Sequence, residues 1–237
     1  MNNKVVKGFL IFIVNLITSI RLIGAFMLPF IYHYSGAGIV SIYIIVLFLT
    51  DSIDGFLART LKVSTFFGSL IDACSDKVLN TISFIILGLE YNIMFAPLII
   101  EISILYTCYS TYRYGGNVRT YLIGKIKTII LDVLVIASFV LISLTTIKNK
   151  TPFITNLINN TNTIIYIFAG VISLFSFLTL YDYIKKYKIV RQNPKCMEIK
   201  YEKKKKRSNK WIIKHLFDTE YYKKHRTESI MKQLYFE

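Results

Sequence analysis

Long uncharged stretches dominate the pattern of hydrophobic and polar positions in this chain. No Asp, Glu, Lys or Arg occurs from Leu22 to Thr50, nor from Thr151 to Tyr181. These stretches are apolar on every side, whereas the strands of a membrane barrel alternate apolar and polar residues. A helix needs about 20 apolar residues to cross a bilayer. The pattern therefore predicts an all-α membrane protein.

Six transmembrane helices are expected, preceded by an N-terminal interfacial helix. Residues 1–18 carry two lysines ahead of an apolar stretch, and hydrophobicity resumes directly after Arg21. This continuity favours an interfacial helix over a cleaved signal peptide. The turn Ser35-Gly36-Ala37-Gly38 separates the first two spans. The expected spans are about residues 20–35, 38–59, 66–89, 93–113, 123–147 and 162–185.

The composition agrees with a membrane protein and excludes several other classes. The chain is 54% hydrophobic and 18% charged, with a mean hydropathy of +0.48. Such values exclude an ordinary soluble enzyme, a disordered chain and a collagen. The three cysteines form no CxxC pair, so neither a zinc site nor a disulfide framework is indicated.

The net charge of +15 is concentrated near the C-terminus. The segment from Lys185 to Glu237 holds 17 Lys and Arg against 6 Asp and Glu, a net +11. Because basic residues mark cytoplasmic loops, both termini are predicted to be cytoplasmic. We expect a membrane domain over residues 1–185 and a basic cytoplasmic tail over 186–237. The tail either lies on anionic lipid or is solvated, and no nucleic-acid partner is expected.

Four aspartates lie in two segments that otherwise read as spans. Asp51 and Asp54 are three residues apart, and Asp72 and Asp76 are four apart, so each pair shares one helix face. If the two helices are antiparallel neighbours, all four carboxylates converge. Ionised groups are costly in a membrane segment, and four of them require a cation. Hard oxygen ligands suit Mg²⁺, Mn²⁺ or Ca²⁺ and not zinc, and Mg²⁺ (or Mn²⁺) is expected because it commonly bridges to substrate phosphates.

Small residues and one arginine accompany these aspartates. Gly55, Ala58 and Gly68 clear the helix faces that carry the carboxylates, so a ligand can approach the backbone. Arg59 can hold a phosphate oxygen. Together these residues predict a site for a metal-bound phosphate.

The combined pattern resembles a known family signature. Asp51-x-x-Asp54-Gly55-x-x-Ala58-Arg59, followed by Gly68-x-x-x-Asp72-x-x-x-Asp76, is similar at every fixed position to the signature of the CDP-alcohol phosphatidyltransferases. The resemblance implies a six-helix membrane fold, usually a homodimer, with a polar cavity open to cytoplasm and lipid. It also implies transfer of a phosphatidyl group from a CDP-alcohol to a hydroxyl, with release of CMP.

The resemblance also implies roles for the motif residues. The metal is expected on Asp51, Asp54, Asp72 and Asp76, and Asp76 is expected to be the general base. Because strong metal binding makes a carboxylate a poorer base, Asp76 should be the least strongly coordinated. The residues implied to bind CDP are Asp51, Asp54, Gly55, Ala58, Arg59 and Gly68.

Two shorter motifs suggest the acceptor. Asn15-Leu16-Ile17-Thr18-x-x-Arg21 and Gly124-Lys125-Ile126-Lys127-Thr128 resemble the bacterial phosphatidylglycerophosphate synthase branch, which implies CDP-diacylglycerol as donor and glycerol 3-phosphate as acceptor. The branch reads Arg-Glu in the fourth span, but here Ile100 precedes Glu101, so one phosphate contact is absent or replaced by Arg113. The candidate acceptor-binding residues are Arg113, Arg119, Lys125 and Lys127, although positive-inside bias alone explains them equally well.

Other functions stay open at this point. The same chemistry could use phosphatidylglycerol (forming cardiolipin), an inositol phosphate, serine or an amino-alcohol. An ion transporter would use the aspartates as an ion site, and an inactive scaffold would not use them. A transporter predicts charges near the bilayer midplane and broken spans in both halves. The aspartates lie near the cytoplasmic ends and in the first half only, which favours an enzyme. The resemblance to the bacterial branch implies the bacterial cell membrane as its location.

Overall fold

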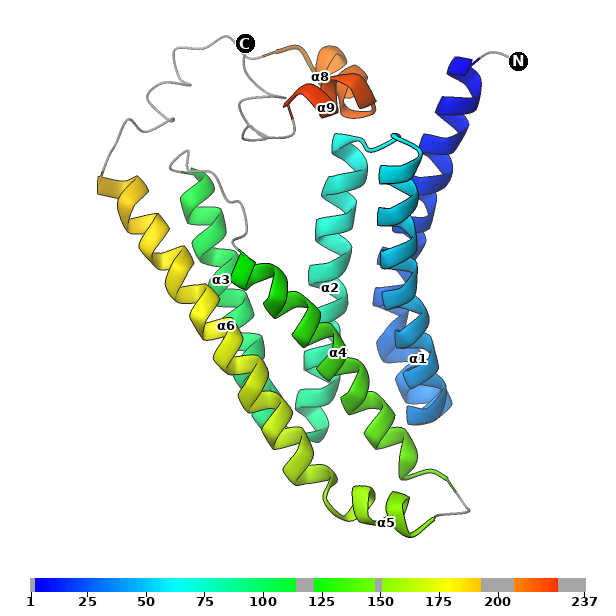
Figure 1. Cartoon of the computed structure of the whole chain (residues 1–237), viewed down its shortest axis with the longest axis vertical. Helices are drawn as coiled ribbons and strands as arrows, with labels where there is room; N and C mark the ends of the chain where they lie inside the picture. The colour runs from blue at the N-terminus through cyan, green and yellow to red at the C-terminus, as the bar shows by residue number, and fades with distance from the viewer. Residues whose placement is uncertain (1–2, 114–121, 148–150, 193–206, 226–237) are drawn as a thin grey trace.

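The computed structural model describes residues 3–113, 122–147, 151–192 and 207–225, and within these ranges the regular structure is entirely helical (Figure 1). This confirms the all-α prediction. Its elements are α1 (Asn3–Thr60), α2 (Phe66–Glu90), η1 (Asn92–Met94), α3 (Phe95–Arg113), α4 (Leu122–Leu144), α5 (Pro152–Asn159), α6 (Thr161–Gln192), α8 (Asn209–Leu216) and α9 (Thr219–His225).

Four stretches in this part of the chain are long and apolar enough to cross a membrane. They are Val6–Thr60, Asn92–Thr111, Ile123–Leu144 and Thr161–Gln192. The helix bounds agree with the expected spans to within a few residues, with two exceptions: the first helix begins at Asn3 and not near residue 20, and α6 continues past 185 to Gln192. Many large apolar side chains on these helices are exposed, as expected for surfaces that face lipid.

The first of these stretches is a hairpin, because α1 folds back on itself at Gly36. Gly36 has φ 74° and ψ 171°, a backbone conformation that glycine adopts without steric strain. The hydroxyl of Tyr43 donates to the carbonyl of Gly24 at 3.0 Å across the hairpin. The turn predicted at Ser35–Gly38 is therefore present. We call residues 3–35 the first arm and residues 37–60 the second arm.

The first arm runs without a break, which differs from the predicted interfacial helix followed by a separate span. All its residues keep helical geometry up to Gly36, although Pro29 lies inside. Two features explain the continuity. Residues 9–23 contain no glycine or proline. Arg21, the charge at the expected boundary, is buried against carboxylates and so is not drawn to the bilayer surface.

A short link joins the second arm to α2. Lys62 adopts φ 55°, and the amide of Val63 donates to the carbonyl of Ala58, which closes the end of α1. Thr65 caps α2, since its hydroxyl accepts from the amide of Gly68 at 3.0 Å. The link therefore sets the second arm and α2 antiparallel, as Figure 1 shows.

The core lies between the α1 hairpin, α2, α4 and α6. Fully buried members include Leu28, Ile44, Phe84, Phe139 and Ile172. The α1–α2 link, the C-terminal ends of α3 and α6, and the helices α8 and α9 all lie at one end of this bundle (Figure 1). The four predicted aspartates lie on α1 and α2.

Candidate active site

The four predicted aspartates converge on one buried arginine. Asp51 and Asp54 come from the second arm, Asp72 and Asp76 from α2, and Arg21 from the first arm. The guanidinium of Arg21 contacts Asp51 and lies 2.7 Å from Asp72, 3.1 Å from Asp76 and 3.7 Å from Asp54. The Arg21 side chain is 0% exposed. One positive charge therefore faces four carboxylates, and the ionised cluster keeps a net charge of −3.

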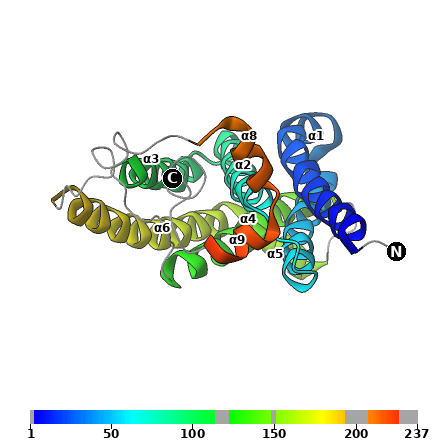
Figure 2. The ribbon, with the colours of Figure 1, turned by 90° about the horizontal axis from the view of Figure 1, so that it is seen from above.

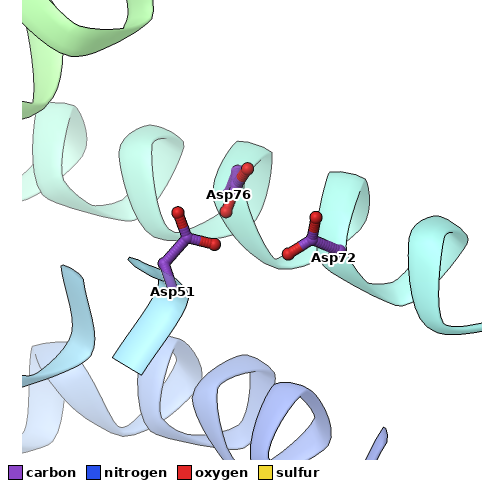
Figure 3. Close-up of side chains that lie close together, drawn as sticks. All are labelled: Asp51, Asp72 and Asp76. Carbon is purple, nitrogen blue, oxygen red and sulfur yellow. The ribbon is translucent and has the colours of Figure 1, made fainter. Parts of the chain in front are cut away.

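Three of the carboxylates are close enough to share a metal ion. Asp51, Asp72 and Asp76 each offer an oxygen, and these oxygens all lie within 4.8 Å of one another. Figure 3 shows Asp51 pointing from the second arm towards Asp72 and Asp76 on α2. Anionic oxygen donors fit Mg²⁺ or Mn²⁺. The excess negative charge of the cluster also fits a divalent cation.

Asp54 is held apart from this group of three. Its side chain is 3% exposed, and its Oδ2 accepts a hydrogen bond from Thr18 Oγ1 at 2.7 Å. Thr18 belongs to the first arm, as does Arg21. The structure therefore brings the motif of the first arm against the aspartates and gives Thr18 and Arg21 roles that their spacing alone did not reveal.

A polar cavity of about 240 Å³ adjoins the aspartates. Among its lining residues are five of the six predicted CDP-binding positions, Asp54, Gly55, Ala58, Arg59 and Gly68, together with Asn15, Thr18 and Asp72. Asp51, the sixth, does not line it. A Cβ placed on Gly68 would lie 2.6 Å from Asn15 Oδ1, so a larger residue at this position would have to displace the Asn15 side chain.

An apolar cavity of about 600 Å³ lies beside the polar one, and the sequence reasoning missed it. It is lined by Gly8, Ile11, Phe12, Asn15, Leu16, Ser19, Phe67 and Phe217. Asn15 lines both cavities. The polar side chain of Asn15 thus marks the junction between a charged pocket and an apolar groove.

A second buried ionic network joins α2, α3, α4 and α6. Both carboxylate oxygens of Glu101 accept from Lys127 Nζ, at 2.7 and 2.8 Å, and one also accepts from Ser176 Oγ at 2.7 Å. Lys77 Nζ lies 3.6 Å from the same carboxylate. Sequence reasoning missed Lys77 and Ser176. Lys77 carried a signal, since a lysine directly after Asp76 in an apolar helix is costly unless it has a partner.

The predicted acceptor-binding residues are only partly placed. Lys127 is buried against Glu101, whereas Lys125 is exposed on α4. The side chain of Arg113 and the whole of Arg119 lie outside the described residues. The role of these four residues in binding an acceptor stays a prediction.

Comparison with curated proteins shows several partial matches. The chain is 31% identical over 112 residues to a CDP-diacylglycerol–glycerol-3-phosphate 3-phosphatidyltransferase of Yersinia enterocolitica, covering 44% of this chain and 60% of that protein. It is 40% identical over 67 residues to the protein of that name from Wigglesworthia glossinidia brevipalpis, covering 28% of this chain and 36% of the relative. The Pseudomonas fluorescens protein of that name is 34% identical over 84 residues, or 33% and 42% of the two chains.

These matches cover less than two thirds of each relative. No solved structure matches the chain. A family model gives the broader result, because the model for CDP-alcohol phosphatidyltransferase matches residues 11–176. That range holds Arg21, the four aspartates and the ionic network around Glu101. Because the match extends over more than half of the chain, the protein belongs to the CDP-alcohol phosphatidyltransferase family.

Proposed function

We propose that this protein transfers a phosphatidyl group from CDP-diacylglycerol to glycerol 3-phosphate, giving phosphatidylglycerophosphate and CMP. The observation that carries the proposal is the pair of cavities that meet at Asn15. CDP-diacylglycerol has a charged nucleotide end and an apolar diacyl end. The polar cavity suits the first, and the apolar cavity beside it suits the second.

The carboxylates would hold one or more divalent metal ions. Asp51, Asp72 and Asp76 would be direct ligands. Asp54, which lies 3.7 Å from Arg21 and accepts a hydrogen bond from Thr18, would be the fourth. When bound, Mg²⁺ or Mn²⁺ would neutralise charge on the donor diphosphate as CMP departs. Arg59, exposed at the edge of the polar cavity, would bind a phosphate oxygen.

Asp76 would act as the general base. The acceptor hydroxyl oxygen attacks the phosphatidyl phosphorus, its proton passes to the Asp76 carboxylate, and the bond from phosphorus to the CMP oxygen breaks. Asp76 suits this role because its side chain is 46% exposed, the most of the four. It is also further from Arg21 than Asp72 is, at 3.1 Å against 2.7 Å.

The acceptor phosphate would be bound near the Glu101 network. Lys77 follows Asp76 on α2 and is 39% exposed, so its ammonium can turn from Glu101 to a phosphate. Lys127 is held by Glu101 on both oxygens, and in this state it positions Glu101 and not a ligand. Arg113, Arg119 and Lys125 remain proposed contacts.

The membrane topology is part of the proposal. The two arms of α1, with α2, α3, α4 and α6, would make six crossings, and both termini would be cytoplasmic. The α1–α2 link, which carries Lys62, lies at the same end of the bundle as α8 and α9, which supports this orientation (Figure 1). Residues 1–185 would be the membrane domain of a homodimer in the bacterial cell membrane, and residues 186–237 its cytoplasmic part.

The test is CMP release by the purified protein from CDP-diacylglycerol. The reaction would contain Mg²⁺ or Mn²⁺ and one acceptor at a time: glycerol 3-phosphate, phosphatidylglycerol, an inositol phosphate, serine or an amino-alcohol. Release with glycerol 3-phosphate alone, and none from Asp76→Asn, is the expected result. Release with another acceptor only would overturn the substrate and keep the family chemistry. No metal-dependent release with any acceptor would favour the scaffold or ion-site alternatives.

A further inference from the structure

The C-terminal helix α9 reaches the polar cavity, although α9 lies far from it in sequence and beyond the residues that the family model matches. Tyr222 of α9 lines the polar cavity together with Gly55, Ala58 and Gly68. We propose that residues 208–225 form one wall of the nucleotide site, where Tyr222 contacts the cytosine ring and Lys223 contacts the diphosphate. This inference rests on the proposed function, because it takes CDP-diacylglycerol as the donor.

Aromatic contacts hold these two helices on the start of α2. The ring centroids of Phe66 and Tyr222 are 4.9 Å apart with the rings at 81°, an edge-to-face arrangement. The centroids of Phe67 and Phe217 are 4.8 Å apart. Figure 1 shows α8 and α9 above the start of α2, and Figure 2 shows them from above. The described part of the tail is therefore docked, which neither the lipid-bound nor the solvated alternative anticipated.

The docked segment also has internal structure that fixes its shape. Ser208 caps α8 by accepting a hydrogen bond from the amide of Trp211 at 3.3 Å. The Trp211 ring stacks on His215, with centroids 3.8 Å apart, and the Arg207 guanidinium lies 3.7 Å from the centre of the Trp211 ring. Tyr221 packs edge-on against Trp211. This small cluster orients α9 so that the next residue, Tyr222, faces the cavity.

A second, cationic cavity adjoins the polar one at Tyr222. Its volume is about 310 Å³, and it is lined by Arg59, Lys62, Ser64, Thr219, Tyr222 and Lys223. Arg59, Ser64 and Tyr222 line both this cavity and the polar one. The site therefore has carboxylates at one end and three cations at the other. A cytidine diphosphate group fits this division, because its phosphates can be neutralised from both ends.

The side chains that line the cavity assign Tyr222 to the cytosine ring of the donor. Within the described part of the chain, Tyr222 is the only aromatic side chain that lines the polar cavity. Gly55, Ala58 and Gly68 line the same cavity, so this part of its wall carries little or no side chain. Stacking of a nucleobase on an aromatic side chain is a strong contact that alanine substitution removes. Lys223 is exposed at the rim, where its charge reaches a phosphate but not the carboxylates.

The experiment measures nucleotide binding and not turnover. The full-length protein in detergent with Mg²⁺ would be titrated with CMP and with CDP by calorimetry. Tyr222→Ala should weaken the binding of both nucleotides about tenfold, and Tyr222→Phe should weaken it much less, because the ring and not the hydroxyl makes the contact. Lys223→Ala should weaken CDP binding about two- to fivefold and CMP binding less, the range expected for an exposed ion pair.

Lys224→Ala is the matched control, since Lys224 is equally exposed on α9 but lines neither cavity. It should bind both nucleotides like the unmodified protein. If the unmodified protein binds CMP and CDP, and Tyr222→Ala and Lys223→Ala bind them as tightly as it does, residues 208–225 do not form a wall of the nucleotide site. The proposed function would still stand. If the unmodified protein binds neither nucleotide, both the proposed role of residues 208–225 and the proposed donor CDP-diacylglycerol are refuted. Lys223→Ala changes a surface residue, so it keeps the test decisive even if Tyr222→Ala fails to fold.

Discussion

Replacing Arg21 with glutamine should make the stability of this protein depend strongly on a divalent metal. Arg21 is the cation that the described structure places among Asp51, Asp54, Asp72 and Asp76, and its side chain is fully buried. Glutamine keeps much of the side-chain volume but removes the charge. The ionised cluster would change from a net charge of −3 to −4 with no internal counter-ion.

The magnitude follows from the burial of the guanidinium. Removing one partner of a fully buried ion pair costs about 3–5 kcal/mol, because the remaining charge is left uncompensated. Solvent screens Asp51, Asp72 and Asp76, which are 37%, 44% and 46% exposed, so the lower end of about 3 kcal/mol applies here. For a chain of this size, each kcal/mol lowers the melting temperature by about 2–4 °C. Arg21→Gln should therefore unfold on the order of 10 °C below the unmodified protein when metal is absent. A divalent cation on the carboxylates should restore most of this difference.

The assay is thermal unfolding of the detergent-purified protein in EDTA and in excess Mg²⁺. Arg59→Gln is the matched control, because Arg59 is exposed at the cavity edge and bonds to none of the four aspartates. The control should melt within about 2 °C of the unmodified protein, as expected for a surface substitution. The reasoning is refuted if Arg21→Gln melts like the control in EDTA, or if Mg²⁺ raises both melting temperatures equally.

Three further outcomes are expected. Asp76→Asn should abolish CMP release while the melting temperature in EDTA stays equal or rises, because the substitution removes a proton acceptor and one repelling charge; retained turnover would exclude Asp76 as the base. Gly68→Ala should raise the KM for CDP-diacylglycerol severalfold, since its Cβ would lie 2.6 Å from Asn15 Oδ1 and must displace it; an unchanged KM would contradict the close approach. Lys127→Met should lower the free energy of unfolding by about 3–5 kcal/mol, measured by thermal unfolding, because it leaves the buried Glu101 carboxylate with only the weak ion pair to Lys77. Adding Glu101→Gln should recover much of that loss. A double variant as unstable as the single one would disprove the pairing of Lys127 with Glu101.

Much of the helical framework and the carboxylate set followed from local sequence. Helix positions depend on runs of apolar residues, and the chain turns where Gly36 permits a positive φ. The spacing of Asp51 from Asp54, and of Asp72 from Asp76, placed each pair on one face, because a helix repeats every 3.6 residues. The short link capped by Thr65 then left an antiparallel arrangement as the natural one. These features involve neighbours in sequence, so sequence suffices to predict them.

Contacts between distant segments could not be predicted in this way. Arg21 stood out only as a motif position, and its role depends on the first arm packing where the second arm meets α2. Glu101 pairs with Lys127 and Ser176 only because α3, α4 and α6 bring these side chains to the same depth in the helical bundle. Docking of Tyr222 beside Gly68 joins the end of the chain to its first third.

By itself, therefore, the sequence determined that this is a helical membrane protein with four metal-binding candidates on two facing helices. Only the tertiary structure decided that Arg21 is buried among them, that Asp54 is set apart with Thr18, and that a polar and an apolar cavity meet at Asn15. The physical reason is that hydropathy and helical periodicity act over a few residues. Burial of a charge, by contrast, depends on which surfaces of distant helices come into contact.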